Sequence, residues 1–259
     1  LLHPDKTGRL APEQVMESVR SDTLLVSLML VNNETGVIQD VDSLGSLLQG
    51  TGTYFHVDAA QGFAKPLGAS LENADLISIS GHKIQAPQGV GALAVRRRGW
   101  NRIPLRPLMF GGGQERKLRP GTTSVPLVSG LSLAAEILSE NGEAWLAGVR
   151  AFREDLFSAL STTHFELNGD PSFCAPHIAN IRFPGVNSEA LIVKLKDIAG
   201  IATGSACTSA SYTPSHVLLA MGFGQSHVLE SVRLSWLPDT PTDDLAVFVE
   251  TINSLSSAA

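Results

Sequence analysis

Short apolar runs that alternate with helical patterns are the feature that most restricts the fold of this chain. The run TLLVSLMLV at residues 23–31 is continuous, and a helical pattern, VDSLGSLLQG, follows at 41–50. Continuous apolar strands separated by helices are typical of a parallel sheet that is covered on both faces. We therefore predict an α/β fold with a mostly parallel sheet, whose further strands lie at 54–58, 75–80 and 91–97.

The pattern changes after about residue 122, where longer helices begin. Two long helical patterns occupy 126–140 and 143–162. The later segments comprise strands at 177–183 and 231–236 and helices at 188–197 and 242–255. This mixture predicts a second, smaller α+β domain. We therefore predict two domains, residues 1–141 and residues 142–259.

Length, charge and cysteine content exclude several classes of protein. The 259 residues are 43% hydrophobic and carry a formal net charge of −6 without a basic run, so we expect no nucleic acid and no membrane surface as a partner. No apolar segment reaches the roughly 18 residues that cross a bilayer. Two cysteines, Cys174 and Cys207, make no disulfide framework and indicate a reducing compartment, which we take to be the cytoplasm.

Lys83 lies in the stretch DLISISGHKIQAPQGVGALAV, residues 75–95, where two apolar runs meet. A lysine at the end of a strand is most often a solvated surface residue. Here Gly81 permits a tight turn, and the APQGVG sequence fixes the path of the chain behind it. Functional groups of parallel sheets gather at the carboxyl ends of strands, and a desolvated lysine amine can form a Schiff base with an aldehyde. Lys83 is therefore a candidate catalytic residue.

Asp58 ends the apolar run of the motif HVDAAQG, one αβ unit before Lys83. An aspartate in this position could simply cap a helix. A carboxylate that faces a lysine-bound aldehyde is also the arrangement that keeps the ring nitrogen of pyridoxal phosphate (PLP) protonated. Gln61, one helical turn later, could reach the ring oxygen or could be an exposed helix residue.

Three weaker signals fit a site of this kind. Asn33 in VNNETG suits a turn or a cap, but its amide could also contact a cofactor ring or a substrate. The segment FGGGQERKLRPGTTSVP at 110–126 combines glycines and arginines with Thr122, which suits a phosphate as well as a flexible, solvated loop. Arg233 lies among apolar residues and needs a carboxylate, either from this chain or from a substrate.

Cys207 lies in ATGSACTSAS, within a small-residue loop at 200–215. A free cysteine is usually a small buried residue. The neighbours here are glycine, alanine, serine and threonine, which predict an exposed loop, and an accessible thiol is the reactive kind. Cys207 is therefore a candidate nucleophile, whereas Cys174, in DPSFCAPH, is expected to be structural or incidental.

Five motifs in this chain resemble, in order and over nearly its whole length, the NifS-like cysteine desulfurases of group I in the class V aminotransferase family. They are VNNETGVIQD, HVDAAQ, SGHKIQAPQGVGAL, GGGQERKLRPGT and GSACTSASYTPSHVLLAMG. The last motif discriminates most, because related aminotransferases and the second desulfurase group lack this loop. The resemblance implies a PLP-dependent enzyme of the aspartate aminotransferase fold (fold type I). Residues 1–141 would then be the C-terminal portion of the PLP-binding large domain, and 142–259 the small domain that carries the cysteine loop.

The resemblance also implies how PLP would be held. Lys83 would bind it covalently, Asp58 would pair with its pyridine nitrogen, and Gln61 would contact its phenolic oxygen. Its phosphate would be held by Ser80 and His82. No metal is implied.

Substrate and partner contacts follow from the same resemblance. Thr122 would reach the phosphate in a partner subunit, so that a homodimer completes the site. Asn33 would contact the cofactor and, together with Arg233, the carboxylate of the substrate. The implied reaction takes sulfur from L-cysteine, releases L-alanine and leaves a persulfide on Cys207. That sulfur would pass to an unidentified acceptor protein for iron–sulfur cluster or thio-cofactor biosynthesis.

Alternative functions stay open at this point. One is a selenocysteine lyase or another class V aminotransferase, and one of a different class is a truncated, non-catalytic dimerisation or regulatory subunit. The family's chains are longer at the amino end, where a helix start cradles the phosphate and a histidine stacks on the ring, and none of the seven histidines here lies in such a motif. We therefore expect a fragment or a truncated form, with an exposed strand edge, weak PLP retention and little activity of these residues alone.

Overall fold

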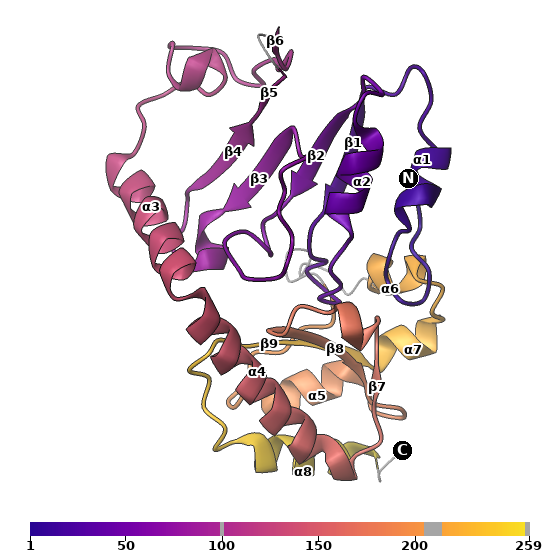
Figure 1. Ribbon diagram of the computed structural model, residues 1–259. Helices are drawn as coiled ribbons and strands as arrows, with labels where there is room; N and C mark the ends of the chain where they lie inside the picture. The colour runs from indigo at the N-terminus through magenta and orange to yellow at the C-terminus, as the bar shows by residue number, and fades with distance from the viewer. Residues whose placement is uncertain (99–100, 205–213, 257–259) are drawn as a thin grey trace. The chain divides into compact units, whose positions relative to one another are not determined.

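The computed structural model describes residues 1–98, 101–204 and 214–256 (Figure 1). The chain divides into two compact units, and each is described by itself. Unit 1 comprises Leu1–Glu17, Val31–Asp40 and Glu143–Ala259, and unit 2 comprises Ser18–Leu30 and Val41–Gly142.

Residues 31–40 belong to unit 1 because their backbone is bonded to a much later segment. The amide of Ile38 donates to the carbonyl of Phe173 at 2.7 Å, and the amide of Ala175 donates to the carbonyl of Gly36 at 2.8 Å. A division into two continuous stretches does not express such contacts. The predicted domains, 1–141 and 142–259, therefore stay a prediction. Units 1 and 2 group residues by the contacts that they make, and a single boundary in the sequence does not describe that grouping.

Unit 2 is built on a four-stranded sheet in the order β1-β2-β3-β4 (Figure 1). Strands β1 (Leu25–Met29), β2 (Tyr54–Asp58) and β3 (Leu76–Ser80) are parallel, and β4 (Gly91–Val95) is antiparallel to β3. The four predicted strands are thus confirmed: β2 has both predicted ends, and the ends of the other three lie at most two residues from the prediction. The antiparallel direction of β4 follows from the short connection behind β3, because a parallel crossover needs a dozen or more residues.

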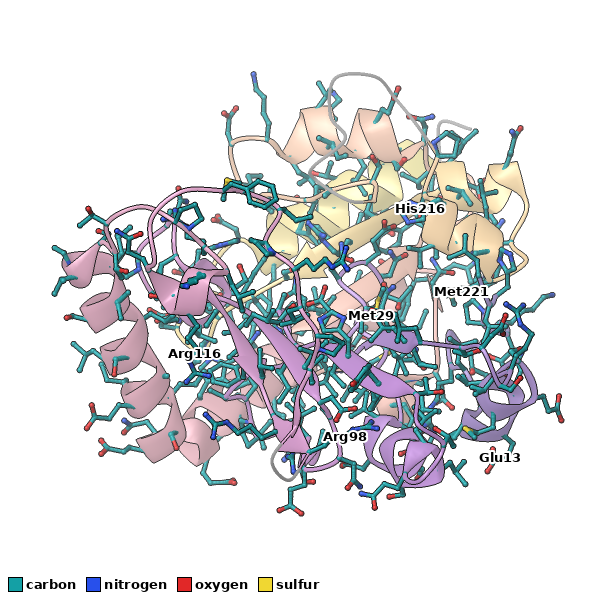
Figure 2. All side chains as sticks on the ribbon, turned by 90° about the horizontal axis from the view of Figure 1, so that it is seen from above. Glu13, Met29, Arg98, Arg116, His216 and Met221 are labelled. Carbon is teal, nitrogen blue, oxygen red and sulfur yellow. The ribbon has the colours of Figure 1, made fainter. Side chains whose placement is uncertain are left out.

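Only one face of this sheet is well covered by the described residues. Helix α2 (Val41–Leu48) packs on the face of Phe55 and Val57, and Gly45 allows the close approach, since a Cβ there would lie 3.4 Å from the ring of Phe55. On the other face Leu25, Met29 and Leu93 are 47%, 39% and 49% exposed (Figure 2 labels Met29). Coverage of both faces stays a prediction, because apolar runs identify strands but not what covers them.

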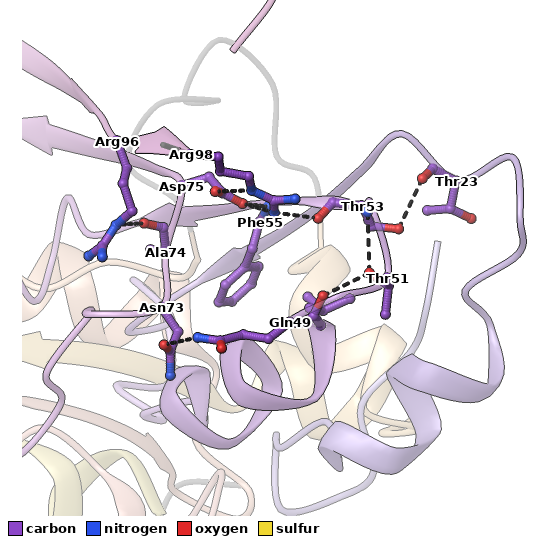
Figure 3. A network of polar contacts seen from close by, with 11 residues as sticks. Thr23, Gln49, Thr51, Thr53, Phe55, Asn73, Ala74, Asp75, Arg96 and Arg98 are labelled. Carbon is purple, nitrogen blue, oxygen red and sulfur yellow. Dashed lines mark hydrogen bonds and ion pairs between the residues drawn. The ribbon is translucent and has the colours of Figure 1, made fainter. Parts of the chain in front are cut away.

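An ion pair between the buried Asp75 and the 38% exposed Arg98 closes the end of the sheet opposite to the carboxyl ends of β2 and β3 (Figure 3). The carboxylate of Asp75 accepts hydrogen bonds from Arg98 at 2.5 and 2.7 Å and from the amide of Phe55 at 2.8 Å. Arg98 also donates to the carbonyl of Thr53 at 2.7 Å. Burial alone would raise the pKa of Asp75, but the bonds from Arg98 and Phe55 outweigh it and hold the pKa below its ordinary value. The stabilisation is therefore present above pH 4 and is lost as the pH falls further.

Replacing Asp75 with alanine should destabilise the protein by about 3 kcal/mol, because the amide of Phe55 and the guanidinium of Arg98 both lose their acceptor. Urea unfolding at neutral pH measures the effect. The matched control is Asp22→Ala, which breaks the pair between Arg20 and Asp22, whose side chains are 77% and 72% exposed. That change should cost less than about 1 kcal/mol. Equal effects of the two substitutions would contradict the assignment.

Unit 1 contains a three-stranded antiparallel sheet in the order β7-β8-β9, formed by Glu166–Leu167, Ile178–Arg182 and Ser231–Ser235. Helices α4 (Gly142–Ala159), α5 (Ser188–Leu195) and α8 (Leu245–Ser256) supply apolar faces, and α5 packs against α8. Buried side chains of this unit include Leu156, Leu160, Phe183, Leu191 and Ile252.

Three short helices of unit 1 lack the long periodic patterns that signal a helix in the sequence. They are α1 (Pro12–Glu17), α6 (His216–Ala220) and α7 (Gln225–Leu229). Helix α6 is followed by the buried Met221, which lies in a small apolar cluster with Leu218 and Val228 (Figure 2 labels His216 and Met221). Among the described helices of the chain, none combines the length and apolar character that crossing a membrane requires.

Candidate functional site

Lys83 lies in a tightly fixed turn at the end of strand β3. The 3₁₀ helix η1, Gly81–Ile84, follows β3 directly, and its C-cap Gln85 has a left-handed backbone with φ of 65°. A Cβ atom at Gly81 would lie 2.8 Å from the carbonyl oxygen of Val90, so a larger residue would force the chain apart here. Lys83 itself is exposed. The turn therefore presents the lysine from a rigid support.

Asp58 and Ser80 end neighbouring parallel strands on the same face of the sheet. Asp58 pairs in register with Ser78, and residues two apart on a strand share a face. Oγ of Ser80 lies 3.2 Å from Nδ1 of His82, the residue before Lys83. Oδ1 of Asp58 accepts a 2.9 Å hydrogen bond from the amide of Ala60, which closes a turn, and Oδ2 can still accept. The helix cap that the sequence left open is not formed, because β2 is followed by turns and not by a helix.

A row of three polar side chains crosses the sheet next to Asp58. Nδ1 of His56 lies 2.8 Å from Oγ of Ser27, and Nε2 lies 2.8 Å from Oγ of Ser78. Each hydroxyl can donate or accept, so the row is satisfied by either tautomer of the imidazole. It ties β1, β2 and β3 together beside the carboxylate. Sequence reasoning missed His56, although the period of two in HVD places it on the face of Asp58.

Lys65 is a second lysine near this edge, and nothing in the sequence around it singles it out. Its Nζ donates a 2.7 Å hydrogen bond to the backbone carbonyl of Gln61. Burial, and to a smaller degree the charge of Lys83, lower the pKa of Lys65 from 10.5 to about 8. The charge of Lys83 affects the pKa of Lys65, so the two amines lie in the same region of unit 2.

The lowered pKa of Lys65 makes a prediction about stability at alkaline pH. Between about pH 8 and 10.5 the unfolded chain holds a proton on Lys65 that the folded chain has released, so stability attributable to this residue rises with pH. From pH 7 to 10.5 the parent protein should gain about 2 to 3 kcal/mol relative to the variant Lys65→Met. Urea unfolding of both proteins at the two pH values measures this difference, in which every other titrating group cancels. Parallel pH profiles would contradict the assignment.

The donors at this edge of unit 2 fit PLP chemically. A carboxylate suits the ring nitrogen, an amide suits the phenolic oxygen, a hydroxyl and an imidazole suit the phosphate, and an amine suits the aldehyde. These groups belong to Asp58, Gln61, Ser80, His82 and Lys83, which the sequence predicted and which all lie at or just after the ends of β2 and β3. Their individual roles stay a prediction.

Thr122, the remaining predicted cofactor contact in unit 2, lies apart from these groups in the sequence. It is exposed in the loop between η2 (Glu115–Lys117) and helix α3 (Val125–Glu140). In the same loop the hydroxyl of Thr123 donates to Oε1 of Glu115 at 3.2 Å. An exposed Thr122 is compatible with a contact across a subunit interface, which stays a proposal.

The two predicted substrate contacts lie in unit 1 and touch each other. Arg233 is half-buried at the centre of β9, and its Nη1 donates a 3.0 Å hydrogen bond to the backbone carbonyl of Asn33. Within the residues that the structure describes, no carboxylate pairs with Arg233. The intrachain ion pair that the sequence left open is therefore not formed there, and the remaining guanidinium donors can hold a carboxylate ligand.

Of the two cysteines, Cys174 lies in the described part of the chain. Cys207 lies outside the described residues, and its role as a nucleophile stays a prediction. Sγ of Cys174 lies 3.6 Å from the carbonyl oxygen of Thr35, and burial raises the pKa of its thiol to about 11. At neutral pH Cys174 is therefore a protonated, weakly nucleophilic thiol, in line with the expected structural role.

Comparison with known proteins identifies the family. The model of the class-V aminotransferase family matches residues 1–248. The chain is 42% identical over 242 residues to the putative cysteine desulfurase IscS 1 of Bacillus subtilis, covering 91% of this chain and 62% of that protein. It is 42% identical over 234 residues to the mitochondrial cysteine desulfurase of Saccharomyces cerevisiae, covering 90% of this chain and 46% of that protein. The chain thus spans about half to three fifths of the length of these relatives.

A solved structure extends the similarity to the fold. DndA from Streptomyces lividans matches with a TM-score of 0.81 at 50% identity, covering 91% of this chain and 67% of that one. This confirms the predicted fold class, the α/β architecture of PLP-dependent enzymes of fold type I, and the resemblance to NifS-like cysteine desulfurases. PLP is the cofactor of this family, and the donor set of unit 2 agrees with it. The chain belongs to the class-V aminotransferase family.

Proposed function

We propose that this chain acts in a cysteine desulfurase, which removes sulfur from L-cysteine and leaves L-alanine. The observation that carries the proposal is the placement of Asp58 and Lys83 at the carboxyl ends of the adjacent parallel strands β2 and β3. The names of the relatives, which are cysteine desulfurases at 42% identity, supply the reaction class.

The residues of unit 2 would bind and orient the cofactor. When bound, PLP supplies an aldehyde that condenses with amines and a ring that accepts electrons from Cα of an amino acid. Asp58 would keep the ring nitrogen protonated, and Gln61 would contact the phenolic oxygen. Ser80 and His82 would hold the phosphate at the turn after β3. Lys83 would anchor the aldehyde and, once released by the substrate, carry a proton to or from Cα.

The residues of unit 1 would hold the substrate and take its sulfur. Arg233 and Asn33 would bind the carboxylate of L-cysteine, and Cys207 would attack the substrate sulfur as a thiolate. A new S–S bond forms as the C–S bond breaks, and the electron pair of that bond ends on the former Cβ, which takes a proton and becomes the methyl group of alanine. The balance is one thiol and one cysteine giving one persulfide and one alanine, without an external oxidant.

Assembly, sulfur transfer and location complete the proposal. Thr122 would reach the phosphate held by a second copy, so that the active form is a homodimer. The persulfide would pass to an acceptor protein for iron–sulfur cluster or thio-cofactor biosynthesis. We place the protein in the cytoplasm because two cysteines in a chain of this length make no disulfide framework. Fractionation tests that location, since one relative is named mitochondrial.

The function is tested by incubating the PLP-loaded protein, isolated in its native form, with L-cysteine, because little activity is expected of these 259 residues alone. We expect alanine by chromatography and a mass increase of one sulfur atom on the peptide that contains Cys207. A keto acid product would instead indicate an aminotransferase, and activity restricted to selenocysteine would indicate a lyase for that substrate. A dimer by gel filtration that takes up no PLP in a titration would favour a regulatory subunit and would contradict the proposal.

A further inference from the structure

The turn VNNETG of unit 1 carries Asn33, one of the two proposed substrate contacts, and its own residues give it its shape. Oδ1 of Asn32 accepts hydrogen bonds from the amides of Glu34 and Thr35, both at 2.9 Å. The carbonyl of Asn32 accepts from the amide of Gly36 at 2.9 Å, and Gly36 has the left-handed φ of 77° that closes the turn. These bonds shape the turn, and other groups attach it to the sheet of unit 1.

Two donors on neighbouring strands hold successive carbonyls of this turn. Nδ2 of Asn180, in β8, donates to the carbonyl of Glu34 at 3.2 Å. Nη1 of Arg233, in β9, donates to the carbonyl of Asn33 at 3.0 Å. Asn180 and Arg233 are paired in register, and directly opposed residues of an antiparallel pair lie on the same face of the sheet. The carboxylate of Glu34 is engaged separately, by the hydroxyl of the buried Ser215. The backbone just after Asn33 is therefore bonded to both strands at once.

The side-chain amide of Asn180 is itself held by a second buried asparagine. Asn180 is only 2% exposed, and its Oδ1 accepts from Nδ2 of the equally buried Asn168 at 2.7 Å. Asn168 also donates to Oγ of Ser231 at 3.0 Å, and its Oδ1 lies 2.5 Å from Nε2 of His227. Since a carbonyl can only accept, Nδ2 of Asn180 must face Glu34. The network thus fixes the orientation of the Asn180 amide.

Asn180 has no role in the proposed mechanism, although it lies beside Arg233. We propose that Asn180 is a positioning residue for the carboxylate of the substrate, because it holds the turn with Asn33 against β8 while Arg233 keeps donors for the ligand. A guanidinium has five N–H donors, and the bond to the carbonyl of Asn33 uses one of them. A shift of the turn would move Asn33 relative to Arg233, so the two proposed carboxylate contacts would no longer converge. The inference rests on the proposed function for the ligand and on the contacts of Asn180 for the structure.

Ligands with and without a carboxylate test the inference. The protein is used in its native, PLP-loaded form, and binding is followed by the absorbance of PLP during titration with L-alanine or with ethylamine, which is L-alanine without its carboxylate. In Asn180→Ala the Kd for L-alanine should rise about tenfold, because a contact to a charged group is misplaced, and the Kd for ethylamine should stay within about twofold. With L-cysteine the KM should rise by a similar factor while kcat stays within about threefold. A role in folding alone would not distinguish the two amines.

The matched control is Ser231→Ala. Ser231 is also 2% exposed, and its Oγ accepts from Asn168 and donates to the carbonyl of His227 at 2.7 Å. This substitution removes buried hydrogen bonds from the same network but leaves the bond from Asn180 to Glu34, so the Kd for L-alanine should stay within about twofold. If Ser231→Ala weakens L-alanine as much as Asn180→Ala does, general loosening explains the effect and the inference is wrong. Asn180→Leu fills nearly the volume of asparagine without either bond, and it should show the same selective loss if Asn180→Ala does not fold.

Arg233→Ala separates failure of this inference from failure of the proposed function. That variant removes the charged donor and should weaken L-alanine about a hundredfold. If Arg233→Ala binds L-alanine as the parent does, the proposed carboxylate site is wrong and the inference falls with it. If Arg233→Ala weakens L-alanine and neither Asn180→Ala nor Asn180→Leu does, the inference alone is overturned. L-alanine binding requires no sulfur transfer, so the titration decides the inference even if the parent protein forms no persulfide.

Discussion

Replacing Cys207 with alanine should abolish persulfide formation while the absorbance spectrum of bound PLP stays as in the parent protein. We expect a loss of roughly a thousandfold or more in cysteine-dependent alanine production, because no second group is assigned to attack the substrate sulfur. The assay is alanine release at saturating cysteine, with the spectrum recorded on the same sample. The substitution removes a thiol among small residues, so it should leave the fold and the cofactor unchanged.

Cys174→Ala is the control for this prediction. Burial raises the pKa of the Cys174 thiol to about 11, so this residue is protonated at neutral pH and should contribute nothing to sulfur transfer. Activity should therefore survive in Cys174→Ala. Undiminished alanine release by Cys207→Ala would contradict the proposed attack of Cys207 on the substrate sulfur, and a lyase or an aminotransferase would become the better hypothesis.

Local sequence patterns predicted the strands and the turn of the candidate site well. The run YFHVD gave strand β2 with both ends correct, and Gly81 signalled the turn that carries Lys83. Both features depend on residues that are neighbours in the chain, and the period of two or a missing Cβ is visible there. That is why the edge with Asp58 and Lys83 could be predicted.

Features that depend on distant contacts could not be predicted in the same way. Glu34 reads as an ordinary polar turn residue, and its partner Ser215 lies 181 residues later. The grouping of residues 31–40 with the segment around Cys174 depends on backbone bonds across a similar distance. Likewise the exposure of Leu25 and Met29 depends on what covers the sheet, which an apolar run does not record.

Replacing Lys83 with alanine should remove the covalent link to PLP and lower activity roughly a thousandfold or more, because the same amine anchors the cofactor and moves the proton at Cα. Reduction of the PLP-loaded parent with borohydride makes the link permanent, and peptide mapping should then find the label on Lys83. The variant Lys83→Ala should carry no label at any position. Lys65→Gln is the matched control and should retain the label.

Lys65 makes this a demanding test, because chemistry alone would favour it as the attachment point. With its pKa lowered to about 8, a substantial share of its amine is neutral and nucleophilic near that pH. Its geometry argues the other way, since Nζ already donates to the carbonyl of Gln61 at 2.7 Å, whereas Lys83 is exposed on a rigid turn behind β3. The fixed position of Lys83 should outweigh the lower pKa of Lys65, because reaction with a bound aldehyde depends on the position of the amine relative to that aldehyde. A label on Lys65 in the parent protein would reverse that judgement and move the centre of the site to the loop after Asp58.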